Sequence, residues 1–293
     1  MLAVVAGLGA ATAFAASTLA STRATRLIGA TSTVAWVTAA GLPLAVAAAL
    51  ADRTGLSLAA VPWLAIAGLG NVAGLMLAYR ALRAGPVSVV APIVSTEGAI
   101  AAVLSVAAGG SISLALLSAL ALVVAGGVLT AASASHAPID ASAPAPPRSS
   151  FPDGRATRRA AVLAIIAAML FGASLYATGH IGRTLPLGWA ALAPRVTGVA
   201  LVALPTAMRG RLVVPRSAAP LVVLAGVAEV FGFACIGLGS RTDVAVTAVL
   251  ASQFAAVAVI GAVLLFRERL GWAQRIGVLA VAIGTALVAA LQA

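Results

Sequence analysis

The sequence predicts an all-α integral membrane protein, and its composition, its charge distribution and the length of its apolar runs carry that prediction. Of the 293 residues, 62% are hydrophobic and only 9% are charged, whereas a soluble domain carries about 25% charged residues. The charged residues cluster in short gaps between apolar runs, most of which approach the roughly 20 residues that a helix needs to cross a lipid core. A fold with a water-exposed surface all round is therefore excluded.

Ten apolar runs are candidate transmembrane helices. The last is short, and its helix is expected to begin nearer Trp272. The first starts at Met1 with no basic segment before it, so we interpret it as a retained span rather than a cleaved signal peptide. The runs are Leu2–Leu19, Leu27–Leu50, Ala59–Tyr79, Val87–Ala108, Leu114–Ala134, Ala160–Gly179, Leu187–Met208, Ala218–Gly239, Val244–Phe266 and Ile276–Ala290.

A polar segment divides these runs into five before it and five after it. Residues 135–158 are rich in Pro and Ser and have no apolar period, which is typical of an extended or disordered linker. The predicted organisation is thus a first five-helix repeat over 1–134, the linker, and a second five-helix repeat over 159–293.

The two halves resemble each other at a nearly constant spacing. "FAAS" at 14–17 matches "FGAS" at 171–174 with an offset of 157 residues. An offset of 158 residues pairs Gly74 with Gly232 and Gly126 with Gly284. Because five is an odd number of helices, a second copy enters the membrane from the opposite side. The expected architecture is an inverted repeat, a plan that recurs in carriers with a central site.

All eighteen basic residues are arginines, and the formal net charge is +11. They stand at the ends of apolar runs rather than on one basic face, so we expect helix anchors and no nucleic-acid partner. Fourteen of the eighteen follow the odd-numbered helices, and the positive-inside rule then places both termini outside the cytoplasm.

Sequence signatures of catalysis are absent. The chain has no GxxxxGK[ST] loop and no HExxH, so neither ATP hydrolysis nor zinc-dependent hydrolysis is expected. The single cysteine, Cys235, excludes a disulfide within the chain and a cysteine-based metal site. We predict no enzymatic activity and no cofactor, with proton coupling as an open possibility.

Glu97 is one of two acidic residues in the middle of an apolar run. Ionisable groups at membrane depth usually face a cavity or the bundle interior. On a continuous helix, Ser95 points about 180° away from Glu97, while Thr96 lies about 100° away and borders the same space. Two interpretations stay open: a protonatable carboxylate facing a cavity, or a structural glutamate that is hydrogen-bonded or paired with Arg195, the one arginine well inside a run.

Glu229 is the second such acid, and its counterpart in the first half is Asn71. Polar residues at equivalent points of two repeats predict a central polar site. The alternative is hydrogen bonding between closely packed glycine-rich helices.

Further candidates are Ser252 and Gln253, which interrupt the ninth run near the point that matches Val94–Thr96. Gln253 is suited either to bind a solute or to bridge helices. Trp36 lies deep in the second run and is a candidate solute contact.

Several segments of the sequence resemble the EamA family of the drug/metabolite transporter superfamily. The chain ends in "VLLFRERLGWAQRIGVLAVAIGTALVAA", similar to the family's closing motif. The "FAAS" and "FGAS" segments resemble its first and sixth helices, and "AALAPRV" places Arg195 at its arginine position. Arg267 replaces the usual glycine of the closing motif. The resemblance implies ten helices, a five-plus-five duplication and secondary transport of small organic solutes.

The sequence therefore predicts a secondary transporter of small organic metabolites, amino-acid-like or drug-like, that works by alternating access and exports its solute. Its partners are the solute and membrane lipid, and its location is the plasma membrane, as a multi-pass protein of a bacterial inner membrane. The oligomeric state is not predicted. A non-transporting scaffold or subunit and a lipid-headgroup flippase are the alternatives.

Overall fold

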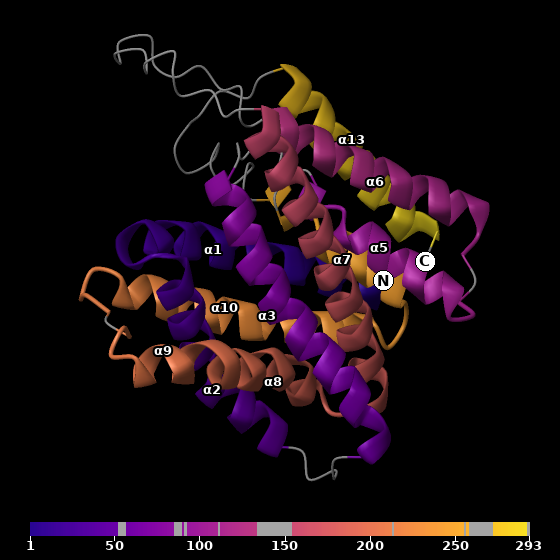
Figure 1. Ribbon diagram of the computed structural model, residues 1–293. Coiled ribbons are helices and arrows are strands. Elements are labelled where there is room, and N and C mark those ends of the chain that lie inside the picture. The colour runs from indigo at the N-terminus through magenta and orange to yellow at the C-terminus, as the bar shows by residue number, and fades with distance from the viewer. Residues whose placement is uncertain are drawn as a thin grey trace.

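The computed structural model describes residues 1–51, 57–84, 90, 93–110, 112–133, 154–212, 214–254, 256–257 and 272–291, and every regular element in these ranges is a helix (Figure 1). In the first half these are α1 (Leu2–Ile28), α2 (Ala30–Leu50), the 3-10 turn η1 (Leu58–Ala60), α3 (Val61–Ala84), α5 (Glu97–Ala107) and α6 (Leu114–Ser133). In the second half they are α7 (Gly154–Thr184), α8 (Leu187–Gly198), the π-helical turn η4 (Val199–Ala203), α9 (Leu204–Met208), α10 (Ala219–Gly239), α11 (Val244–Ala251) and α13 (Trp272–Leu291).

Six of the described helical segments are long and apolar enough to cross a membrane: Leu2–Thr25, Ala30–Leu50, Leu58–Ala81, Arg158–Thr184, Leu187–Met208 and Ala219–Gly239. Shorter apolar helices lie at Glu97–Ala107, Leu114–Leu129 and Arg275–Val288. The chain is a multi-pass membrane protein, and the regular elements in its described ranges are all helices. The full count of ten helices stays a prediction, and the closing motif around Glu268 lies outside the described residues.

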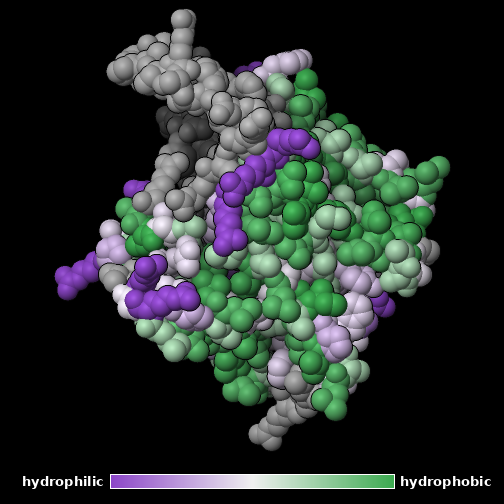
Figure 2. Space-filling view, viewed as in Figure 1, coloured by the Kyte–Doolittle hydropathy of each residue, from purple (hydrophilic) through white to green (hydrophobic). Residues whose placement is uncertain are grey.

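Large apolar side chains lie outside and small ones lie inside, the reverse of the usual order in a soluble protein. Alanine dominates the buried positions, whereas exposed positions carry side chains such as Leu58, Leu114 and Met208, which are 87%, 81% and 80% exposed. Figure 2 shows apolar residues covering most of one face, with hydrophilic side chains gathered in a few places. Small residues let helix backbones approach closely, and lipid contacts the large ones outside.

Several helix ends differ from the predicted bounds. As expected, α13 begins at Trp272. Helix α1 continues to Ile28, and Gly29, whose φ of 79° is costly for other residues, is the only residue between it and α2. Helix α7 begins at Gly154, inside the stretch assigned to the linker. Residues 135–153 of that stretch lie outside the described residues.

Helices of the first half pack mainly against helices of the second. The closest pairs are α1 with α10, α3 with α7, α2 with α8, α5 with α11, and α6 with α13. Figure 1 shows α3 and α7 running side by side, and α6 lying along α13. The core between the halves is therefore formed jointly and belongs to neither half alone.

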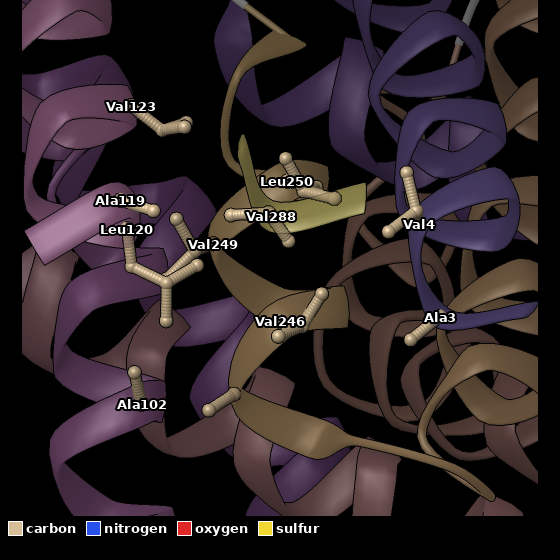
Figure 3. Packing of buried hydrophobic residues seen from close by; sticks show 11 residues of the cluster. Ala3, Val4, Ala102, Ala119, Leu120, Val123, Val246, Val249, Leu250 and Val288 are labelled. Carbon is tan, nitrogen blue, oxygen red and sulfur yellow. The ribbon is translucent and has the colours of Figure 1, made fainter. Parts of the chain in front are cut away.

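One apolar cluster joins the two ends of the chain. Ala3 and Val4 of α1 pack in the same cluster as Leu120 of α6, Val249 of α11 and Val288 of α13 (Figure 3). Near its two ends the chain therefore reaches the same region of the bundle, and Figure 1 shows both termini on one side.

Two predicted helices are broken at corresponding places. The expected continuous helix over Val87–Ala108 is interrupted by a turn at Ser95 and Thr96, so Glu97 begins α5 instead of lying in mid-helix. The Thr96 backbone N–H and hydroxyl both donate to Ile93 O, at 3.2 and 2.7 Å, and this closes the turn. In the second half, α11 ends at Ala251 and the next two residues also form a turn.

Candidate functional site

A cavity of about 100 Å³ lies between the two halves of the chain. It is bordered by helices α1, α3, α5, α7 and α10 and by the segments that flank the two helix breaks. Its lining contains two acids, an amide and two serines among aromatic and aliphatic side chains. The lining residues are Phe14, Ser17, Thr18, Asn71, Leu75, Val94, Glu97, Phe171, Ser174, Leu175, Glu229, Phe233 and Phe254.

Glu229 on α10 is held by two partners from different helices. Arg195 Nη2 on α8 donates to Glu229 Oε2 at 2.5 Å, and the Ser17 hydroxyl on α1 donates to Glu229 Oε1 at 3.1 Å. All three residues are buried. A buried carboxylate is tolerated when it is paired and hydrogen-bonded in this way, because the partners replace the lost hydration.

Arg195 lies behind Glu229 and does not line the cavity. Its side chain is fully buried, and its guanidinium carbon lies 5.7 Å from the centre of the Phe233 ring, within range of a cation–π contact. Gly41 on α2 leaves room for it, since a Cβ there would lie 3.0 Å from Arg195 Cδ. Its Nε and Nη1 atoms have no hydrogen-bond partner in the described part of the chain.

Asn71 on α3 is the residue that the predicted repeat pairs with Glu229 on α10. It is 8% exposed and lines the cavity, and its Oδ1 atom accepts no hydrogen bond from the described residues. Ser174 on α7, the counterpart of Ser17, donates instead to the backbone oxygen of Ala67 at 2.7 Å. The same polar positions are thus used differently: one half has a paired acid, and the other has an amide with a free acceptor.

Glu97 enters the cavity from the first turn of α5. It is 7% exposed, and it makes no ion pair with another described residue. The predicted alternative of a Glu97–Arg195 pair is wrong, because Arg195 pairs with Glu229. Glu97 is therefore a carboxylate at a cavity wall with no counter-ion among its described neighbours.

Two phenylalanines pack on glycines in a reciprocal arrangement. The Phe14 ring on α1 lies against Gly232 on α10, where a Cβ would stand 2.4 Å from Phe14 Cε1. The Phe171 ring on α7 lies against Gly74 on α3, where a Cβ would stand 2.7 Å from the ring. Glycine at these two positions lets both rings border the cavity.

Besides Arg195, five predicted site residues do not line the cavity. The Ser95 side chain is buried and Thr96 is used in the turn before α5. The Ser252 hydroxyl donates to Val249 O at 2.8 Å. Gln253 donates from Nε2 to Val249 O at 3.1 Å, and its Oε1 lies against Gly127 of α6, so it contacts a neighbouring helix. Trp36 packs elsewhere, in a cluster with Ala24, Val37, Val222 and others.

Five of the ten lining residues that were not predicted belong to patterns visible in the sequence. Phe14, Ser17, Phe171 and Ser174 are the first and last residues of the repeated "FAAS" and "FGAS" segments. Phe233 stands four residues after Glu229, on the same helix face. The repeat indicated their equivalence, but it did not indicate that they face each other across one cavity.

Comparison with known proteins supports the fold and the family. Residues 1–132 match the model of the EamA-like transporter family. A solved structure, described only as the crystal structure of a protein, is similar over 99% of this chain and 97% of that chain, with a TM-score of 0.77 and 19% sequence identity. At that identity the likeness shows the fold alone. Comparison with curated proteins gives no significant match. The match over residues 1–132 agrees with the family resemblance that the sequence predicted.

Proposed function

We propose that the protein is a secondary carrier of small organic metabolites that alternates access to a central site, with export as its direction and the bacterial plasma membrane as its location. One observation carries the proposal above the others: the polar cavity is lined by counterpart residues from both halves of the chain. Ser17 and Ser174, and likewise Asn71 and Glu229, face the same space.

The helix contacts support an inverted duplication. Exchanging each helix for its counterpart turns the α1–α10 contact into the α7–α3 contact, and the α2–α10 contact into the α8–α3 contact. This reciprocity is what an internal two-fold relation produces, and in such carriers the solute binds at the repeat interface.

The two broken helices support the same function. Discontinuous helices at corresponding points of two halves are the best structural pointer to a carrier's binding site. Here the turns before Glu97 and before Phe254 both lie beside cavity-lining residues. Non-helical backbone at membrane depth is tolerated where protein or a cavity surrounds it.

The dimensions of the cavity favour a small solute. Pockets for drug-sized ligands usually measure about 300–1,000 Å³, and this cavity of about 100 Å³ is well below that range. An apolar groove of about 640 Å³ between α5 and α6 shares no lining residue with it. No described lining residue joins this apolar groove to the polar cavity, whereas a flippase would be expected to have a lateral opening beside its polar site.

A metabolite screen followed by a flux measurement tests the proposal. Purified protein is screened by thermal unfolding, because a bound solute raises the melting temperature. Hits are then loaded into proteoliposomes, and counterflow is measured for wild type, Asn71→Leu and the control Thr12→Val, whose exposed hydroxyl bonds only within α1.

We expect saturable flux in wild type and in Thr12→Val, and loss of flux in folded Asn71→Leu. Absence of flux for every solute that binds, together with stoichiometric co-purification of another protein, supports the scaffold instead. Flux of labelled phospholipid supports the flippase.

A further inference from the structure

We propose that the cavity selects an organic cation: a protonated amine attached to a small apolar or aromatic body. The inference deepens the proposed function, on which it rests for the movement of the solute, although binding can be tested without transport. It is carried by the charges, the hydrogen-bonding atoms and the aromatic rings that line the cavity.

The charges at the cavity do not balance. Among the described lining residues there are two acids, Glu97 and Glu229, and no arginine or histidine. Arg195 compensates Glu229 from behind. When both acids are ionised, Glu97 leaves one negative charge without a partner, and a buried charge of this kind requires a counter-ion. A cationic solute provides it.

Two acceptor groups at the cavity have no described donor, although the Thr18 hydroxyl and the Asn71 amide nitrogen also belong to the lining. Both cavity serines already donate their hydroxyl protons, Ser17 to Glu229 and Ser174 to Ala67 O. Asn71 Oδ1 is buried and accepts nothing from the described residues, and an ionised Glu97 can only accept. An ammonium group carries donors and no acceptor, so it complements this set of atoms.

Aromatic rings complete the match. Four of the seven phenylalanines in the chain line this cavity: Phe14, Phe171, Phe233 and Phe254. Aromatic faces attract cations and also accommodate an apolar body. Phe233 already has the Arg195 guanidinium within 5.7 Å of its ring centre, so this environment holds a cation within the protein itself.

A carboxylate solute lacks a comparable partner. The nearest candidate, Arg195, uses Nη2 for Glu229, and its Nε and Nη1 atoms are fully buried away from the cavity. An anion at this site would therefore meet an uncompensated glutamate and no exposed cation. Like charges in a site of low dielectric constant repel strongly.

Three probes of nearly the same size and different charge test the proposal: benzylamine, benzyl alcohol and benzoate. Binding to the purified full-length protein is measured by thermal shift and equilibrium dialysis. We expect saturable binding of benzylamine alone. Glu97→Gln removes the charge at almost constant shape, and we expect it to weaken benzylamine binding by at least about tenfold. Glu97→Asp keeps the charge and retains measurable binding.

Asp243→Asn is the matched control. Asp243 caps α11 through a 3.0 Å hydrogen bond from the Val246 N–H and lies outside the cavity lining. Asparagine caps helices about as well as aspartate. The same carboxylate-to-amide change at this position should therefore leave benzylamine affinity unchanged. The melting temperature of each variant without probe shows whether it is folded.

The outcomes separate the two proposals. Equal binding of all three probes, preferred binding of benzoate, absence of benzylamine binding to folded wild type, or undiminished benzylamine binding by folded Glu97→Gln overturns the cation inference, and the carrier is then judged by its own flux assay. Benzylamine binding that depends on Glu97, with no flux of benzylamine or of any screened solute in proteoliposomes, supports the cation site and overturns the carrier.

Discussion

At the residue scale, the ion pair between Arg195 and Glu229 is the one salt bridge at the site among the described residues. Both side chains are buried, so each requires the other to offset its lost hydration. The pair also joins α8 to α10, and the Ser17 hydroxyl adds α1 to the same contact. The interpretations of Glu229 as a site residue and as a link between helices are therefore compatible, because one carboxylate lines the cavity and holds three helices.

We expect Glu229→Gln to lower stability as well as transport. The change leaves the Arg195 charge buried without a counter-ion, and breaking a buried pair costs about 3–5 kcal/mol. The melting temperature of the purified variant should fall clearly below that of wild type. An unchanged melting temperature would contradict the buried pair.

The double variant Arg195→Met/Glu229→Gln separates stability from function. Replacing both charges with neutral side chains of similar size is often neutral or stabilising, so the melting temperature should recover. Transport in proteoliposomes should stay low, because Glu229 also lines the cavity. Normal transport by the folded double variant would show that the pair serves structure alone.

Glu97 predicts a pH dependence of a definite sign. The described groups that face it are Glu229, whose charge Arg195 matches, and the uncharged side chains of the cavity. Its carboxylate must be ionised to hold an ammonium group, so benzylamine binding should strengthen as the pH rises through the titration of Glu97. Glu97→Gln should flatten this profile and change the pH dependence of proteoliposome uptake. An unchanged profile would remove the coupling role.

At the element scale, glycine sets the distance between helices. Gly226 on α10 crosses α2 at Val37 and Gly41, directly beside the Arg195 side chain. A Cβ at Gly226 would lie 2.6 Å from Val37 O and 2.9 Å from Gly41 N, which are backbone atoms that cannot rotate away. The crossing therefore depends on two glycines, one from each half of the chain.

Gly226→Ala should destabilise the protein by about 1–3 kcal/mol, the usual cost of overpacking. Gly9→Ala is the matched control, because its nearest neighbour would be Cys235 Sγ at 3.4 Å, an ordinary contact. Alanine also favours a helix over glycine by about 1 kcal/mol, so the control should be as stable as wild type or more so. Thermal unfolding of both variants in detergent measures the difference, and equal melting temperatures would contradict a fixed crossing.

At the scale of the whole molecule, the reciprocal contacts of the two halves predict opposite orientations in the membrane. A chain with five spans on each side of its linker places both termini on one side of the membrane and the linker on the other. The shared cluster of Val4 and Val288 agrees with termini on one side.

A reporter that fluoresces only in the cytoplasm tests this orientation. Fused after Ala293, it should stay dark, because the arginine distribution places the termini outside. Inserted after Asp140 in the linker, it should fluoresce. Fluorescence at both positions would contradict five spans per half, and the reversed pattern would contradict the orientation alone.

The broken helices mark a limit of sequence reasoning. Periodicity and hydropathy report whether a segment is apolar, and they do not report whether its helix is continuous. Val87–Ala108 is mainly apolar, with a few polar residues. The turn at Ser95–Thr96 is visible only in the structure. There Glu97 is the first residue of α5, and α5 packs against α7 and α11. The angular argument from a continuous helix placed Thr96 beside the space that Glu97 borders, whereas the Thr96 hydroxyl donates to Ile93 O in the turn and Thr96 is not among the lining residues.

The sequence by itself determined that this is a helical membrane protein and that Glu97, Glu229 and Arg195 are costly groups at membrane depth, and it predicted which positions correspond in the two halves. These conclusions depend on hydration and spacing along the chain, which are local properties. Only the tertiary structure decided that Arg195 neutralises Glu229 and leaves Glu97 without a counter-ion among the described residues, that four phenylalanine rings line the cavity, and that Trp36 and Gln253 lie away from it. Such pairings depend on how helices cross, and the crossings are set by close contacts between distant glycines.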